Sequence, residues 1–256
     1  MRDKAAPTNG MDKATRNKPG DNPQPRKKLG IIGGMGPAAT AHFYALVTSM
    51  TQAETDQEHL EAHIISRPSI PDRTAYILGK SDQSPVPHIV ESGRMLAKIG
   101  AGLIAIPCVT SHFFYDELQE GINVPIINMV RETAAFLSQA QIKAAGIMAT
   151  DGAVRSGLFQ NELNASGIRA IAPSETMQAR VMDLIYNNIK ANRPFDIESF
   201  KTVTNELRAN GAERILLACT EFSLIRQTSK LSSEYVDVLE ILAKRSIELC
   251  GYTLIK

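Results

Sequence analysis

The sequence has few cysteines and no long apolar run. These two shortages argue against a disulfide-rich or zinc-binding protein and against a membrane-spanning one. The chain has three cysteines among 256 residues. None of them form a CxxC pair, so neither a disulfide framework nor a zinc site is expected. The apolar stretches are much shorter than the roughly 18 residues of a membrane-spanning helix. The net charge of +1 indicates no partner class. We therefore predict a soluble protein of a reducing compartment, the cytoplasm, without a membrane or nucleic-acid partner.

The N-terminal segment lacks large apolar side chains. Residues 1–27 are rich in Lys, Arg, Asn, Pro and Gly, and they contain no apolar stretch like that of a secretory signal peptide. Such a segment cannot bury enough surface to offset the entropy lost on ordering. We therefore expect a disordered basic tail at residues 1–27, and we do not expect export.

From Lys28 onward, short apolar runs alternate with longer amphipathic segments. The runs predicted as strands are KKLGIIGG, AHIIS, GLIAIPC, VPIINM, AAGIMAT, IRAIAP and RILLACT. Helices are predicted to begin near Ala38, Val86, Ser111, Asn128, Ala153, Glu175, Asp196 and Ser232. This alternation predicts an α/β fold whose parallel sheets are covered by helices on both faces.

A weak internal repeat divides the chain into two halves. KKLGIIGGMGPAAT and IKAAGIMATDGAV both pass from a buried strand through a turn of small residues into a helix. A second strand ending in cysteine follows each of them at a similar interval. We predict a first domain of residues 28–128 together with 233–256, and a second domain of residues 129–232. Because parallel sheets bind ligands at the carboxyl ends of their strands, the turns and cysteines are expected to meet in one cleft.

Cys108 and Cys219 are the strongest candidates for chemistry. They end the runs IAIPC and ILLAC, and a helix is expected to follow each. The helix dipole and free N–H groups at such a place favour a thiolate. Two thiols in equivalent places suggest an acid and a base on opposite faces of one carbon. A free cysteine is also a common core residue, and Cys250 in IELCGY is predicted to be structural.

The turn GGMGP at residues 33–37 is a candidate anion site. Its backbone N–H groups precede a helix and can face a carboxylate. It fits neither the P-loop nor the dinucleotide-binding fingerprint. A tight turn without a ligand is the alternative.

Polar side chains follow both cysteines. The hydroxyls of Thr110 and Thr220 can bind a substrate carboxylate or cap a helix, and His112 is either a general acid or an orienting donor. Arg73, in a loop bounded by prolines, can hold a carboxylate with two hydrogen bonds or be an exposed loop residue. Taken alone, Lys190 is typical of a solvated lysine at a helix end.

The motifs GGMGP, IPDRT, PC-x-T-x-H and CTE, in this order, resemble those of the aspartate racemases of the aspartate/glutamate racemase superfamily. The resemblance runs from Lys28 nearly to the end of the chain. It implies two pseudo-symmetric α/β domains with the active site between them, a homodimer, and an enzyme without cofactor or metal. It further implies that two thiols invert the α-carbon of a small-molecule amino acid substrate by a two-base mechanism.

The resemblance also assigns roles to individual residues. Cys108 and Cys219 fall on the catalytic pair. The substrate-binding residues it indicates, together with the neighbouring hydroxyls, are Met35, Gly36, Arg73, Thr110, Thr150, Lys190, Thr220 and Glu221. Glu221 favours the aspartate branch, because glutamate racemases typically have histidine at this place. Val109 departs from the family pattern PCNTxH, in which an Asn amide helps to bind the substrate. Losing such a hydrogen bond costs about 1–3 kcal/mol.

The predicted function is racemisation of aspartate or a related acidic amino acid. Within the superfamily, the alternatives are a racemase of another substrate, a hydantoin-type racemase, and a one-sided isomerase or decarboxylase. The presence of both cysteines disfavours the one-sided reactions. Outside enzymes, the alternative is a non-catalytic small-molecule binding protein, for which Val109 is the support. A thiol redox role is weaker still, because the CxxC spacing is missing.

Overall fold

The protein forms two parallel β-sheets surrounded by helices, as the alternating pattern predicts. The computed structural model describes residues 25–228 and 231–255, so the predicted tail lies outside it except for residues 25–27. The strands within these ranges are β1 (Lys28–Gly33), β2 (Ala62–Ser66), β3 (Ala101–Ala105), β4 (Ala144–Met148), β5 (Arg169–Ile171), β6 (Arg214–Leu217) and β7 (Tyr235–Asp237).

Helices occupy most of the connections. The α-helices are α1 (Pro37–Met50), α2 (Arg73–Ile77), α3 (Val86–Lys98), α4 (Tyr115–Gly121), α5 (Met129–Gln139), α6 (Asp151–Arg155), α7 (Leu158–Ala165), α8 (Glu175–Asp183), α9 (Ile197–Ala209), α10 (Thr220–Thr228) and α11 (Val238–Leu249). The described part of the chain also has two short 3₁₀ segments, η1 (Asp56–Glu58) and η2 (Val109–Phe114), and one π-helical segment, η3 (Leu184–Ile189). None of the described helices combines the length and the apolar character needed to cross a membrane.

β1 is the central strand of the first sheet, whose order is β2-β1-β3. Its side chains alternate between the two faces of the sheet. Leu29 and Ile31 pack in the same cluster as Phe43 of α1, whereas Ile32 packs with Leu96 of α3. A strand covered on both faces has to be apolar throughout, which explains the run LGIIG.

The second sheet repeats this arrangement. Its order is β5-β4-β6-β7, all parallel, and its central strand β4 is buried along its whole length. The strands β4, β5 and β6 therefore take the places that β1, β2 and β3 have in the first sheet. This correspondence agrees with the internal repeat, and it places the segments after β3 and β6 at equivalent positions.

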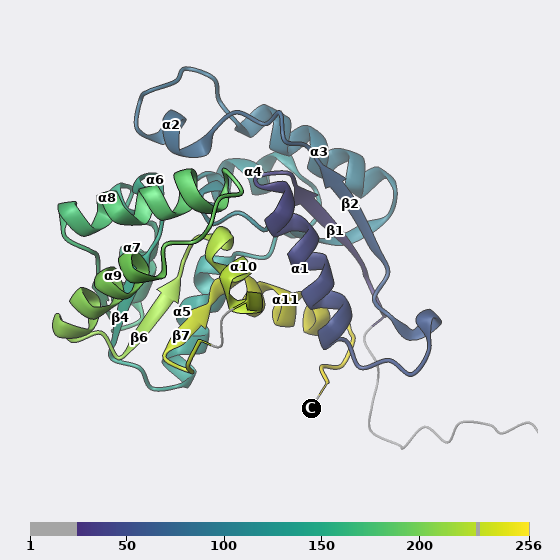
Figure 1. Cartoon of the computed structure of the whole chain (residues 1–256). Coiled ribbons are helices and arrows are strands. Elements are labelled where there is room, and N and C mark those ends of the chain that lie inside the picture. The colour runs from purple at the N-terminus through teal and green to yellow at the C-terminus, as the bar shows by residue number, and fades with distance from the viewer. Residues whose placement is uncertain (1–24, 229–230, 256) are drawn as a thin grey trace, which may run out of the picture.

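The two sheets share one hydrophobic cluster. Ile31 of β1 and Ile147 of β4 both belong to it, and α11 contributes Leu242. α11 packs against α1 and α5, and Figure 1 shows α10 and α11 in the middle of the view, between the elements of the two sheets. The division into 28–128 with 233–256 and 129–232 stays a prediction. α11 contacts α1, while β7 pairs with β6 in the second sheet.

Some local predictions are wrong. VPIINM forms no strand, because it pairs only at Ile126 and Asn128 already caps α5. The segment at Ser111 is first a 3₁₀ helix, and the α-helix begins at Tyr115. The helix expected from Ser232 begins at Val238, after the short strand β7, which carries too few residues to show a periodicity. α10 follows Cys219 directly, as expected for the segment after the run ILLAC.

Candidate active site

Cys108 and Cys219 line one small cavity. Cys108 follows β3 and precedes η2, and Cys219 follows β6 and precedes α10. Each is 6% exposed. The space between them, called here the two-thiol cavity, has a volume of about 20 Å³. A space of this size holds about one water molecule, so surrounding side chains must move before an amino acid can fit between the thiols.

The lining of this cavity contains every predicted site residue except Gly36. These residues are Met35, Arg73, Cys108, Thr110, Thr150, Lys190, Cys219, Thr220 and Glu221. Gly36 lies next to it, where an added Cβ would be 3.4 Å from Glu221 Oε1 and 3.8 Å from Lys190 Nζ. The structure thus brings the predicted residues together, and their individual roles stay predictions.

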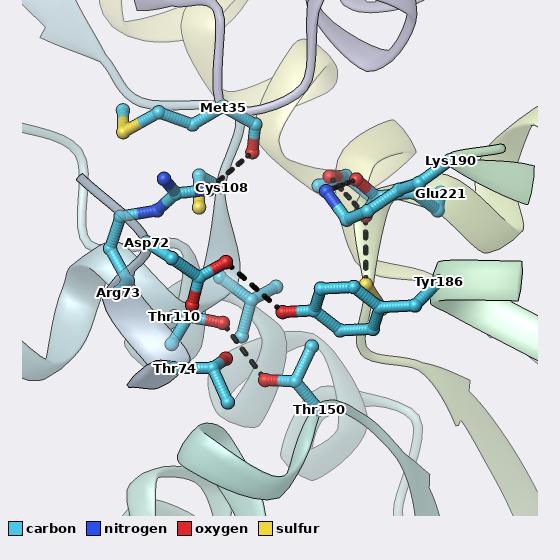
Figure 2. A pocket seen from close by; sticks show the side chains of 13 residues that line it. Met35, Asp72, Arg73, Thr74, Cys108, Thr110, Thr150, Tyr186, Lys190 and Glu221 are labelled. Atoms are coloured by element: carbon cyan, nitrogen blue, oxygen red, sulfur yellow. Dashed lines mark hydrogen bonds and ion pairs between the residues drawn. The ribbon is translucent and has the colours of Figure 1, made fainter. Parts of the chain in front are cut away.

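Cys219 belongs to a chain of three contacting groups. Its thiol donates a hydrogen bond to Glu221 Oε2 over 2.8 Å, and Glu221 Oε1 forms an ion pair with the Lys190 ammonium (Figure 2). Burial and the negative charge of Glu221 raise the pKa of the Cys219 thiol. Burial alone would lower the pKa of Lys190, but Glu221 and Cys219 raise it. Cys219 is therefore a protonated thiol, and Lys190 is charged.

Arg73 lies on the Cys108 side of the cavity. Its guanidinium donates to the carbonyls of Ile70, Pro71 and Met35 at 3.3, 3.0 and 3.4 Å. Burial alone would lower its pKa, but interactions with Cys108 and Asp72 raise it. Nε of Arg73 is buried and has no hydrogen-bond partner. Arg73 therefore keeps one buried donor available for an anion in the cavity.

Two hydrogen bonds join the two halves across the cavity. Tyr186 of η3 donates to Asp72 Oδ2 over 3.3 Å, and the hydroxyls of Thr110 and Thr150 are 3.1 Å apart. Figure 2 shows both pairs, with Tyr186 opposite Asp72. Burial and the charge of Asp72 raise the pKa of Tyr186 to about 12. Tyr186 therefore stays a neutral donor at physiological pH.

His112 is an orienting group rather than a general acid. Nδ1 is 3.0 Å from the carbonyl oxygen of Cys108, and Nε2 is 3.2 Å from that of Ile127. Burial lowers the pKa of His112, so its ring is neutral and donates to one carbonyl at a time. It holds the backbone at Cys108 and does not contribute to the cavity lining.

The turn before α1 brings backbone close to the ion pair. Gly34 has φ +93, and a Cβ there would be 2.3 Å from the backbone nitrogen of Arg67. Gly36 is the N-cap of α1 and receives no side-chain capping bond. This helix end therefore lies beside the ion pair of Lys190 and Glu221.

Asp72, Thr74 and Tyr186 also line the two-thiol cavity, and the sequence analysis missed them. Asp72 and Thr74 flank Arg73 in the motif IPDRT. Tyr186 precedes Lys190 by one helical turn, and residues four apart share a helix face. The helical spacing from Lys190 was therefore the available signal. Within residues 25–228 and 231–255, no group of three or more His, Cys, Asp and Glu side chains could hold a metal ion.

Two thiols from equivalent strand ends of an α/β fold thus line one cavity, one of them hydrogen-bonded to a carboxylate and the other beside a guanidinium. The family model for Asp/Glu/Hydantoin racemase matches residues 32–245. The chain belongs to this family and is an amino-acid racemase, an isomerase, as the motifs predicted.

Similar proteins of known structure or activity agree with this family assignment. The structure of the Picrophilus torridus aspartate racemase is 33% identical with a TM-score of 0.77, and the match covers 90% of this chain and 96% of that one. The broad specificity amino-acid racemase RacX of Bacillus subtilis (strain 168) is 26% identical over 231 residues, which are 86% of this chain and 96% of the relative. Glutamate racemase from Francisella tularensis, at 14% identity, 88% and 81% coverage and a TM-score of 0.61, shares the fold.

Proposed function

We propose that the protein inverts the α-carbon of aspartate or a related acidic amino acid without a cofactor, with Cys108 and Cys219 as the two bases. The observation that carries this proposal is that both thiols line one cavity at equivalent strand ends. A substrate placed between them would present opposite faces of its α-carbon to the two sulfur atoms.

The different surroundings of the two sulfur atoms suggest a direction for the first turnover. Cys219 is a thiol hydrogen-bonded to Glu221, so it serves as the acid. Cys108, beside the cationic Arg73, serves as the thiolate base. Cys108 takes the α-proton, and the electron pair of the broken C–H bond passes into the carboxylate. Cys219 then gives its proton to the other face. The two sulfur atoms have exchanged states, and the opposite enantiomer reacts in the reverse direction.

Arg73 and Lys190 supply the positive charge that this reaction needs. The buried Nε–H of Arg73 can donate a hydrogen bond to the α-carboxylate, on which negative charge grows in the transition state. Lys190 can hold the side-chain carboxylate of an acidic substrate. Lys190 is already paired with Glu221, so the substrate must displace Glu221, which is then free to bind the substrate ammonium.

The test uses the full chain with a reductant and without pyridoxal phosphate, in D₂O with L- or D-aspartate. NMR follows loss of the α-proton, and chiral chromatography follows inversion. With the unchanged protein we expect both loss of the α-proton and inversion. Cys108→Ala and Cys219→Ala should each lose inversion by at least about 100-fold, a typical contribution of a positioned acid or base. Cys250→Ala is the matched control, because Cys250 lies outside the cavity, and it should keep inversion. A single-cysteine variant at full rate contradicts the two-thiol mechanism.

Val109 favours a second candidate, racemisation of another amino acid. Its side chain is 3% exposed and lines the two-thiol cavity, where it offers a substrate no hydrogen bond. Exchange with another amino acid but not with aspartate would support this candidate. The predicted homodimer and cytoplasmic location also stay proposals, and light scattering on the purified protein tests the homodimer.

A further inference from the structure

A larger recess adjoins the two-thiol cavity. Its volume is about 590 Å³, and it shares with the cavity a wall formed by Met35, Asp72, Arg73, Lys190 and Glu221. Lys190 stands at this boundary, since 27% of its side chain is exposed. The two spaces therefore adjoin at these side chains, and an amino acid whose α-carbon lies between the thiols would extend its side chain toward the larger one. We call this space the outer recess.

The outer recess is apolar beyond the shared wall. Of the described residues that line it there, Asn192 alone has a polar side chain. The larger apolar residues come from the start of α1, the loop before α2, η3 and α10, and they are Pro37, Pro68, Ile70, Ile189 and Leu224. Apolar walls with a few polar groups at one end are typical of ligand pockets. These walls offer contacts that the short, charged side chain of aspartate cannot use.

The outer recess is also larger than an aspartate side chain requires. Its volume of about 590 Å³ is within the roughly 300–1,000 Å³ of pockets that bind drug-sized ligands. The aspartate side chain, by contrast, is a single methylene and a carboxylate. That carboxylate would be held at Lys190, on the shared wall, and would leave the space beyond Ile70 and Leu224 unfilled.

The charges of the shared wall fit a substrate with an uncharged side chain. Two cations, Arg73 and Lys190, face two anions, Asp72 and Glu221. A zwitterionic amino acid can place its carboxylate at Arg73 Nε and its ammonium near Asp72 or Glu221, and it leaves the Lys190–Glu221 pair intact. An acidic substrate brings a further negative charge and must break that pair. The wall is therefore not selective for acidic side chains.

We infer that the outer recess is the side-chain subsite of this racemase, and that it admits amino acids with uncharged side chains longer than that of aspartate. This inference rests on the proposed function, because it takes the α-carbon to lie between Cys108 and Cys219. Ile70, Ile189 and Leu224 are the residues that determine its specificity.

The test compares kcat/KM for α-proton exchange in D₂O with aspartate, alanine and methionine. Methionine should exceed alanine by at least about tenfold, the smaller end of the effect of a methylene group in an apolar pocket. Leu224→Trp fills the recess from α10 and should lower the methionine value at least tenfold more than the aspartate value. Ile189→Phe fills the recess from η3 and should also lower the ratio of kcat/KM for methionine to that for aspartate. Met95→Trp is the matched control, on α3 at a residue that is 51% exposed. It should change neither the methionine value nor the aspartate value of kcat/KM.

The outcomes separate this inference from the function on which it rests. If aspartate exchanges but methionine is no better than alanine, the subsite is wrong and the racemase stands. The subsite is also wrong if both filling variants, folded by circular dichroism, leave the ratio of methionine to aspartate unchanged. If no amino acid exchanges its α-proton, the proposed function itself fails.

Discussion

Glu221 contacts both the Cys219 thiol and the Lys190 ammonium, so one side chain influences the protonation of two others. Its carboxylate keeps the proton on Cys219 and the charge on Lys190. It also occupies the place at Lys190 that a substrate carboxylate would take. For an acidic substrate, which must displace Glu221 from Lys190, entry and thiol activation would therefore be coupled, because moving Glu221 removes the negative charge that, with burial, raises the pKa of Cys219.

Replacing Glu221 by glutamine tests this coupling in the free protein. Glu221→Gln removes the negative charge beside Cys219 and leaves Lys190, whose charge lowers the pKa of the thiol. We expect the pKa of Cys219 to fall, so that thiolate forms at lower pH. The measurement is thiolate absorbance near 240 nm against pH, in a Cys108→Ala, Cys250→Ala background so that Cys219 is the only thiol. Glu240→Gln, on α11 and outside the lining of the two-thiol cavity, is the control. An unchanged or higher pKa in Glu221→Gln contradicts the role of Glu221.

Val109 is where the chain departs from its family pattern, and the departure can be reversed. Val109→Asn places an amide at the wall of the two-thiol cavity. If aspartate lacks this hydrogen bond in the unchanged protein, kcat/KM for aspartate should rise about tenfold, the equivalent of about 1.4 kcal/mol. The assay is chiral chromatography at limiting substrate. Val109→Ala, which shortens the side chain without adding a donor, should not raise it. A fall in both variants would show that the apolar side chain itself is needed.

Among the elements, the turn from β1 into α1 depends on glycine for two separable reasons. Gly34 and Gly100 have the same φ, +93, which side chains rarely adopt. An added Cβ at Gly34 would also meet the backbone of Arg67 at 2.3 Å, whereas one at Gly100 would meet nothing within 4 Å. The two positions therefore separate backbone strain from steric overlap.

Alanine substitution measures this difference. Gly100→Ala should lower the free energy of unfolding by about 1–3 kcal/mol, the cost of a left-handed conformation. Gly34→Ala should cost about 2 kcal/mol more, because the backbone of the loop at Arg67 must shift, and it should also reduce racemase activity through the turn at Met35. Urea unfolding gives both free energies. Equal losses would mean that the loop moves without cost.

The sequence predicted the elements that carry a clear periodicity and missed those that depend on tertiary pairing. The apolar strand around Ile31 and its counterpart around Ile147 were evident because both faces are buried. The apolar run around Ile126 looked like a strand as well, but Pro125 cannot donate a backbone hydrogen bond. At the site, Cys108 and Cys219 were evident from their equivalent positions. Tyr186 was missed because Lys190, whose helical spacing leads to it, resembled a solvated lysine, and because its partner Asp72 is distant in sequence.

At the scale of the whole molecule, buried thiols make the free energy of unfolding depend on pH in the alkaline range. Burial raises the pKa of Cys250 to about 12 and, with Glu221, raises that of Cys219. In the unfolded chain both thiols would have a pKa of about 8.5. Above that pH the unfolded chain loses protons that the folded protein keeps. The stabilisation is therefore complete below pH 8.5 and is lost as the pH rises toward the folded values.

Cys250→Ala isolates the contribution of Cys250 to this pH dependence. Cys250 is fully buried at the end of α11. Between pH 9 and 10.5, the free energy of unfolding of the unchanged protein should fall with pH more steeply than that of the variant, by about 1.4 kcal/mol per pH unit. The cavity left by the substitution lowers the stability at every pH and does not change this slope. Urea unfolding at a series of pH values under reducing conditions measures it. Parallel curves for the two proteins would mean that the Cys250 thiol titrates in the folded protein as it does in the unfolded chain. A steeper fall in the unchanged protein would show that the packing of α11 against both halves holds this thiol in its protonated form.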